Sequence, residues 1–431
     1  MSLLAIAGAV AFFAGVLVSI ALHELGHFVP AKIFGVKVAQ YFVGFGRTLW
    51  STRRGETEYG VKLLPAGGYV RMIGMLPPNA SGQARRWSTG MFQSLIDGAR
   101  TQAAEEIEPG EEDRAFYSKP WWQKIIVMLG GPAVNIALAF LLIGAAMIGV
   151  GVYQPTTTIG AVSDCVLPAT ANRTCQPGDP PSPAKAAGVE PGDQVVSING
   201  VAIHDWRQAQ DAIRAVPGKT VPMVVERDGS RTTLHVSVID NRQVDLTNPG
   251  KYVHAGFVGV SPTQVRVHAS VGDVVDSVSS MTVMSGQALL RIPQRMVGVV
   301  QAAFGGTRAE NSPMSVVGAS RLAGEMATGD IAGAHLSVPD RVALLLQWLG
   351  ALNLFLGLFN LIPLLPLDGG HVAGAIWEAI KRGVARARRL PDPGHVDVAK
   401  GLPIAYAMAT VLIVMGAVLV YADIVNPVRL G

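Results

Sequence analysis

The sequence predicts an α-helical membrane protein with four transmembrane helices, a small cytoplasmic, membrane-associated β-sheet and one aqueous α+β domain. The chain of 431 residues is 49% hydrophobic and only 15% charged, which is unusually apolar for a soluble protein. A helix needs roughly 20 residues to cross a hydrocarbon core of about 30 Å. The stretches that are uncharged and long enough are residues 3–22, 125–153, 342–367 and 402–422.

The first stretch, residues 3–22, is predicted to be a retained span and not a cleaved signal peptide. Its apolar run is longer than a usual signal core, no basic region precedes it, and no small-residue cleavage site follows it. Pro30 and Gly35 are expected to break the helix, with Pro30 ending it. We therefore place the first span within residues 1–30.

The rest of the chain divides by composition. Residues 31–75 alternate in polarity around a polar turn, which predicts the β region. Residues 76–122 are polar and predict a cytoplasmic linker, which brings Trp121 and Trp122 to the membrane interface. The later segments are a span at 123–153, a folded domain at 156–240, an extracytoplasmic helical region at 241–341, a span at 342–367, a cytoplasmic loop at 368–401 and a span at 402–424.

Two glycines of the β region, Gly44 and Gly46, allow two interpretations. Glycine inside a strand often marks the close approach of another backbone. An edge strand at this place could bind an extended substrate segment by strand addition. The alternative is an ordinary cytoplasmic hairpin.

Basic residues near the span ends predict the orientation. Lysines and arginines are frequent in residues 29–124 and 368–401, whereas residues 154–172 and 322–340 contain none. The basic segments are therefore expected in the cytoplasm, and both termini and the domain between the second and third spans outside it. The net charge of +4 reflects this asymmetry, and no basic-aromatic pattern suggests a nucleic-acid partner.

The only two cysteines, Cys165 and Cys175, fall on the predicted outer side. In an oxidising compartment such a pair predicts a disulfide, here one that closes a short loop. Two free thiols are the alternative.

The sequence HELGH, from His23 to His27, follows the first apolar stretch. Residues i and i+4 lie on one face of a helix, so His23 and His27 can bind one metal ion. Glu24 lies beside the first ligand, where a general base for zinc hydrolysis is typically found. Ionisable residues in a span indicate function by default, although a histidine pair reaching to the interface is the alternative.

A catalytic zinc usually has three protein ligands, so a third residue must reach the depth of the histidines. The first and third spans run in the same direction, and their C-terminal ends therefore lie on the same side of the membrane. Asp368 follows the third span and is the expected third ligand, with His371 as the alternative. The helix is expected to unwind there, at Pro363, Pro366, Gly369 and Gly370.

Three motifs together carry a family resemblance. The segment SPAKAAGVEPGDQVVSING, with the helix and hairpin after it, closely resembles the PDZ domains of bacterial membrane-associated and envelope proteases. With HELGH in the first span and NLIPLLPLDGG ending the third, almost the whole chain resembles the site-2 protease family of peptidase M50 type. The bacterial regulator-of-sigma-factor protease is the most similar type.

This resemblance implies an intramembrane zinc metalloendopeptidase in the bacterial plasma (inner) membrane, with its active site toward the cytoplasm. His23, His27 and Asp368 would bind Zn²⁺, Glu24 would activate water, and Asn360 would help to bind the substrate or the transition state. The expected partners are the lipid bilayer and single-span substrates of the anti-sigma factor type, already cut outside by another protease. The PDZ domain would restrict access by substrate size.

Two other classes of function are possible alternatives. The first is a membrane-anchored PDZ adaptor whose metal site is catalytically inactive. The second is a metal transporter, which predicts several staggered sites across the membrane.

Overall fold

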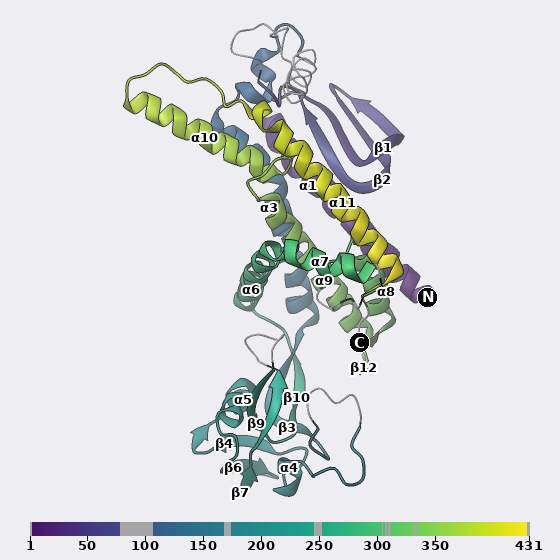
Figure 1. The fold of residues 1–431 in the computed structure, drawn as a ribbon, viewed down its shortest axis with the longest axis vertical. Helices are drawn as coiled ribbons and strands as arrows, with labels where there is room; N and C mark the ends of the chain where they lie inside the picture. Colours follow the sequence, from purple (N-terminus) through teal and green to yellow (C-terminus); the bar gives the residue numbers. More distant parts are fainter. Residues whose placement is uncertain are drawn as a thin grey trace. The chain divides into compact units, whose positions relative to one another are not determined.

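The computed structural model describes residues 2–77, 107–167, 174–244, 252–303, 305–306, 308, 312–331 and 334–428 (Figure 1). The chain forms two compact units, the first made of Met1–Val150 with Ala269–Gly431 and the second of Gly151–His268. Most of the predicted linker, residues 78–106, lies outside the described residues.

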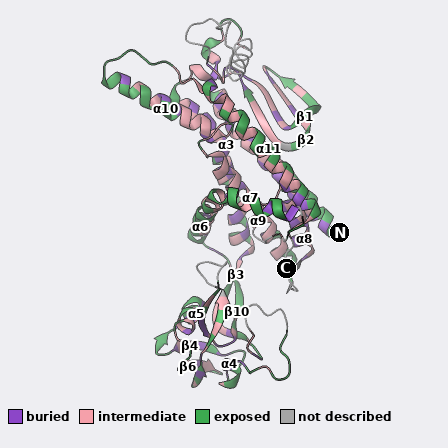
Figure 2. Ribbon diagram, in the orientation of Figure 1, coloured by how far each residue is buried: buried purple, intermediate pink, exposed green. Residues whose placement is uncertain are grey.

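The first unit contains the predicted spans. In the part of the chain that the structure describes, 4 helical segments are long and apolar enough to cross a membrane, which confirms this prediction. They are α1 (Leu3–Ile33), α3 (Trp121–Gly144, continued by a π-helical segment Ala145–Val150), α9 (Val338–Asn360) and α11 (Leu402–Val425). Many of their side chains are exposed, as expected for surfaces that face lipid (Figure 2).

Helix α1 continues past Pro30, so the prediction that Pro30 ends the helix is wrong. A proline near the end of a helix lacks only one N–H donor and otherwise fits helical φ, so the last turn can form. The carbonyl oxygen of Pro30 accepts a hydrogen bond from Phe34 N–H at 2.9 Å. Gly35, at φ +69°, ends the helix, and Val36 N–H donates back to Ala31 at 2.9 Å in a Schellman-type cap.

The chain after α9 differs from the prediction in a second way. The irregular part is residues 361–367, and the predicted loop 368–401 begins with a helix, α10 (Asp368–Ala387). Gly369 and Gly370 lie in its first turn, where they do not unwind the helix. A Cβ at Gly369 would overlap the carbonyls of Leu361 and Ile362, so the glycine permits this close return of the chain.

Strands β1 (Val38–Arg54) and β2 (Thr57–Met72) form the β-sheet predicted for residues 31–75. Residues 38–43 pair with residues 68–72, and residues 40–43 also pair with residues 58–61, while residues 50–54 pair with residues 57–61. Both strands therefore bend back on themselves. As a result, the single hairpin forms a sheet with several rows of paired backbone. Gly44 and Gly46 lie at the bend of β1 with φ of +95° and +84°, a region that favours glycine.

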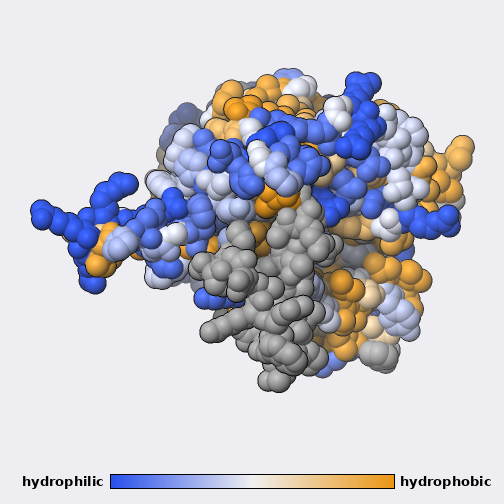
Figure 3. All heavy atoms as spheres, turned by 90° about the horizontal axis from the view of Figure 1, so that it is seen from above, coloured by the Kyte–Doolittle hydropathy of each residue, from blue (hydrophilic) through white to orange (hydrophobic). Residues whose placement is uncertain are grey.

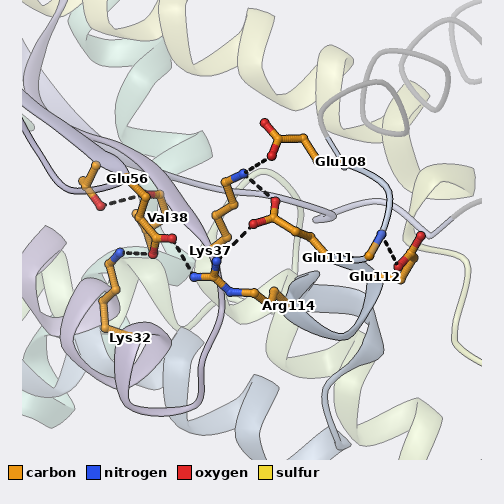
Figure 4. Close-up of polar contacts among 10 residues, drawn as sticks. Lys32, Lys37, Val38, Glu56, Glu108, Glu111, Glu112 and Arg114 are labelled. Carbon is orange, nitrogen blue, oxygen red and sulfur yellow. Dashed lines mark hydrogen bonds and ion pairs between the residues drawn. The ribbon is translucent and has the colours of Figure 1, made fainter.

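The end of the first unit that carries this sheet and α10 is mostly hydrophilic when seen from above (Figure 3). An ion network connects the end of α1, the sheet and the segment before α3 there (Figure 4). The carboxylate of Glu56 lies with Oε1 2.5 Å from Lys32 Nζ and with Oε2 2.6 Å from Arg114 Nη2. Lys37 Nζ lies 2.5 Å from Glu111 Oε2. Burial opposes the ionisation of Glu56, but hydrogen bonds from Lys32 and Arg114 hold its pKa below the usual value.

Three further helices of the first unit follow the second unit in sequence: α6 (Val271–Leu290), α7 (Ile292–Ala303) and α8 (Val316–Thr328). A capping box of Ser270 and Asp273 starts α6. Helix α8 packs closely on α1 at Gly324. The approach is so close that a Cβ at this position would overlap the Ala5 carbonyl. Two short strands, β11 (Asp330–Ile331) and β12 (Ala334–His335), separate α8 from α9.

The second unit is built on a 6-stranded sheet in the order β10-β3-β4-β6-β7, with β5 paired to β4. The strands are β3 (Val152–Val162), β4 (Gln194–Ile198), β5 (Val201–Ala202), β6 (Thr220–Arg227), β7 (Ser230–Ser237) and β10 (Val260–Val267). Helices α4 (Pro183–Ala186) and α5 (Trp206–Arg214) belong to this unit, and Trp206, Ile198 and Met223 lie in its hydrophobic core.

This unit extends beyond residues 156–240 in both directions. The prediction of a helical region from residue 241 is wrong for its first part, which forms β8 (Ile239–Val244), β9 (Tyr252–Phe257) and β10. The reason is a long-range pairing, since β10 lies beside β3 in the sheet. Cys165 and Cys175 are joined in a disulfide with Cα atoms 5.8 Å apart.

Candidate metal centre

Helix α1 and the start of α10 bring three potential metal ligands together. His23 and His27 lie one helical turn apart on α1, and Asp368 is the first residue of α10. The Nε2 atoms of the histidines are 3.3 Å apart, and Asp368 Oδ2 lies 3.4 Å from His23 Nε2 and 3.3 Å from His27 Nε2. Three donor atoms thus form a nearly equilateral triangle.

The size of this triangle fits zinc. Ligand atoms about 2.0–2.1 Å from a tetrahedral zinc ion lie about 3.3 Å from one another, and two imidazoles with one carboxylate are a common catalytic ligand set. Asp368 Oδ2 is buried and has no hydrogen-bond partner among the described residues. A buried carboxylate oxygen without a donor is costly unless it is paired or binds a metal.

The backbone of α3 orients one of the histidines. His27 Nδ1 donates a hydrogen bond to the carbonyl oxygen of Val127 at 2.8 Å. A proton on Nδ1 leaves Nε2 with its lone pair, and Nε2 is the atom that points to Asp368. The contact therefore selects the tautomer that can bind a metal.

Glu24 lies beside the triangle and is only 8% exposed. Strand β2 passes close to the Glu24 side chain at Gly68, where a Cβ would lie only 2.7 Å from Glu24 Cγ. The same sheet is fixed to α1 by Tyr41, whose hydroxyl donates to the Ala21 carbonyl at 2.6 Å. A buried carboxylate next to three metal donors is positioned for acid–base chemistry on water.

Comparisons with known proteins identify the family. The model for Peptidase family M50 matches residues 11–390. The chain belongs to peptidase family M50. It is 34% identical to the zinc metalloprotease Rip1 of Mycobacterium tuberculosis over 99% of both chains. It is 32% identical to Rip1 of Mycolicibacterium smegmatis over 98% of both, and 25% identical to the zinc metalloprotease RasP of Geobacillus kaustophilus over 88% of this chain and 89% of RasP.

The structure places the other predicted residues of this M50 peptidase outside the triangle. His371 lies three residues beyond Asp368 on α10 and does not belong to the donor cluster found among the described residues. Asn360 is the last residue of α9. Gly44 approaches the backbone of β2 in its own sheet, where a Cβ would lie 2.8 Å from Lys62 O, and a Cβ at Gly46 would make an ordinary contact with the Leu64 side chain at 3.7 Å.

One residue of the site was not predicted from the sequence. Gly131 of α3 lies against both imidazoles, and a Cβ there would be 2.7 Å from His23 Nε2 and would overlap His27 Nε2. The only signal in the sequence is the glycine pair Gly130–Gly131 inside an apolar span, because glycine in a span often marks close helix packing.

Proposed function

We propose that this M50 peptidase is an intramembrane zinc endopeptidase that cleaves single-span membrane proteins. The observation that carries the proposal is the triangle of His23, His27 and Asp368 beside a buried glutamate, in which both histidines and the glutamate belong to a helix of membrane-spanning length and composition. The relatives named above are zinc metalloproteases and are similar along nearly the full chain.

The chemistry of the chain follows from this geometry. Zinc, when bound, supplies a Lewis acid that acidifies water and polarises a carbonyl oxygen. Glu24 takes the proton from the attacking water and passes it to the leaving amine, a role for which its position beside the ligands is suited. Asn360 contributes to binding the substrate or the charge that develops on the carbonyl oxygen.

The substrate helix has to unfold locally, because amides inside a helix are hydrogen-bonded and shielded. Residues 68–72 of β2 pair with β1 and pass Glu24 at Gly68. An extended substrate segment that pairs with this sheet would therefore lie beside the general base. The contribution of Gly44 and Gly46 is to shape the bend of the sheet and the approach of the substrate to it.

The substrate class and topology are also part of the proposal. The substrates are anti-sigma-type proteins that another protease has already shortened outside the cytoplasm. The second unit acts as a PDZ domain that restricts access by size, and it lies with both termini outside the cytoplasm. The distribution of lysine and arginine supports this orientation, with the metal centre toward the cytoplasmic side.

The alternatives have less support. A catalytically inactive adaptor would not require a buried Glu24 beside the ligands. A transporter needs several sites along the membrane, whereas the described residues contain a single cluster of potential ligands with metal-binding geometry, made of two histidines and one aspartate.

The test compares wild type with Glu24→Gln in proteoliposomes that contain a single-span model substrate. We expect the variant to lose cleavage by several orders of magnitude while its zinc content stays equal to wild type, because Glu24 is not a ligand. Cleavage by Glu24→Gln at the wild-type rate would falsify the mechanism. The inactive variant can then be used in cells to trap and identify natural substrates.

A further inference from the structure

We propose that α10 is a membrane-surface helix that binds anionic phospholipid headgroups and thereby ties a metal ligand to the bilayer. Its first residue is Asp368. The inference requires only that the chain is embedded in a membrane, and it is independent of peptidase activity.

The helix carries an apolar stripe that no described part of the chain covers. Ile376, Ile380 and Val384 recur every four residues and therefore lie on one face, with Trp377 beside them. These side chains are between 46% and 54% exposed. The opposite face, with Ala375, Glu378 and Ala385, is buried. Such a two-faced helix is typical of segments that lie in the membrane interface.

The anchoring of α10 sets its depth. Glu378 accepts a hydrogen bond from Lys124 Nζ at 2.8 Å, and Lys124 lies in the first turn of α3. Trp121 and Trp122 precede Lys124 and are 40% and 44% exposed. Since exposed tryptophans at a span end mark the membrane interface, the middle of α10 is held at interface depth. In Figure 1, α10 leaves the bundle of spans sideways.

The charges beside the apolar stripe indicate which kind of membrane surface α10 binds. Lys381 and Arg388 border it on one side, Arg386 lies toward the other, and Arg389 follows the helix; all are exposed. The one acidic side chain of α10 after Asp368, Glu378, is buried in ion pairs. An exposed apolar stripe with only cations at its edges is complementary to anionic lipid headgroups, whereas a protein partner would be expected to face mixed charges.

The test uses the fact that both cysteines are joined in the disulfide, so that neither offers a free thiol. Because the described chain has no free cysteine and the sequence has only two, an introduced cysteine is the only thiol available for a nitroxide label. We would label Ile380→Cys in vesicles of phosphatidylcholine with phosphatidylglycerol and measure collisions with oxygen and with a water-soluble nickel chelate. Val411→Cys, exposed on span α11, is the lipid-facing control, and Ser230→Cys, exposed in the second unit, is the aqueous control.

We expect the label at residue 380 to behave like the lipid-facing control, with high oxygen and low nickel accessibility. In phosphatidylcholine alone, or with Lys381, Arg386 and Arg388 all changed to Gln, nickel accessibility should rise. Each lost charge weakens association with an anionic surface about five-fold. Nickel accessibility equal to that of the Ser230→Cys control in anionic vesicles overturns the proposal. Protection from both reagents also overturns it, because it means that protein covers the stripe.

Discussion

A methyl group added at Gly131 would overlap His27 Nε2 and lie 2.7 Å from His23 Nε2. The site therefore depends on a residue that contributes no chemistry of its own. The absence of a side chain at this place on α3 leaves the two imidazoles free to adopt the positions that they have beside Asp368.

We accordingly expect Gly131→Ala to lower zinc affinity by about ten- to a hundred-fold, because the added methyl group displaces the imidazoles, as changes to the residues that orient metal ligands typically do. Zinc content of the purified protein, measured by mass spectrometry during titration with a chelator, reports the change. Gly144→Ala on the same helix is the matched control, since a Cβ added there would lie 3.8 Å from Val274 Cγ1, an ordinary contact distance. Full zinc retention by Gly131→Ala would contradict this account.

The three residues of the triangle could be predicted from the sequence, and the glycine could not. His23 and His27 follow from i, i+4 spacing on one helix, and the direction of the spans brought Asp368 to the same depth. The role of Gly131 depends on which face of α3 meets α1, and that is a tertiary contact with no local pattern.

At the level of elements, the packing of α10 against α3 depends on a buried ion pair. Lys124 and Glu378 have side chains only 8% and 2% exposed, and Arg382 and His395 lie 3.3 and 3.5 Å from the same carboxylate. Breaking a buried pair by removing one partner leaves an uncompensated charge, which is more costly than replacing both partners by apolar groups.

Glu378→Gln should therefore lower the free energy of unfolding by about 3–5 kcal/mol. Chemical unfolding in detergent, followed by α-helical circular dichroism, measures this loss. The double variant Lys124→Met, Glu378→Met should recover most of it. A double variant as unstable as the single one would show that the pair is not what holds α10.

The same carboxylate predicts a dependence on pH. Burial opposes its ionisation, but hydrogen bonds from His395 and Lys124 lower the pKa of Glu378 from 4.5 to about 2. The unfolded chain thus binds the proton more readily, and the stabilisation is complete above about pH 4.5 and is lost as the pH falls toward 2. Between pH 5 and pH 3, the melting temperature of wild type should fall more than that of Glu378→Gln.

Helix α10 also shows where prediction from sequence stopped. The stripe of Ile376, Ile380 and Val384 was present in the sequence, but residues 368–401 were predicted to be a loop, and their basic residues were used only to predict orientation. The sheet of β1 and β2 was predicted from the alternation of polar and apolar residues. Its bends depend on which segments of the two strands pair with one another. In both cases the local residue pattern indicates the type of element, whereas tertiary contacts determine the residues at which it begins and ends.

At the scale of the whole molecule, the chain divides into a membrane unit and a unit with its own hydrophobic core. The core around Ile198, Met223 and Trp206 lies entirely within Gly151–His268. Sequence patterns predicted this domain but ended it too early, because β10 pairs with a strand that begins more than 100 residues before it.

We expect residues 151–268, expressed alone, to fold into a monomer with dispersed amide resonances and a cooperative thermal transition. Replacing Cys165 and Cys175 by Ser should lower its stability by about 2–3 kcal/mol, the effect of opening a loop of this length. A fragment that ends at residue 240, the limit predicted from sequence, lacks β9 and β10 and is the control that should not fold. Equal folding of the two fragments would contradict the extended boundary.

The contact between α1 and α3 has a consequence for how a substrate enters. A Cβ at Gly26 would overlap the Gly130 carbonyl, and the converse is also true, so the two backbones touch one turn from the ligands. No polypeptide can pass between helices in such contact. A substrate segment that reaches Glu24 would therefore have to approach from another side of α1.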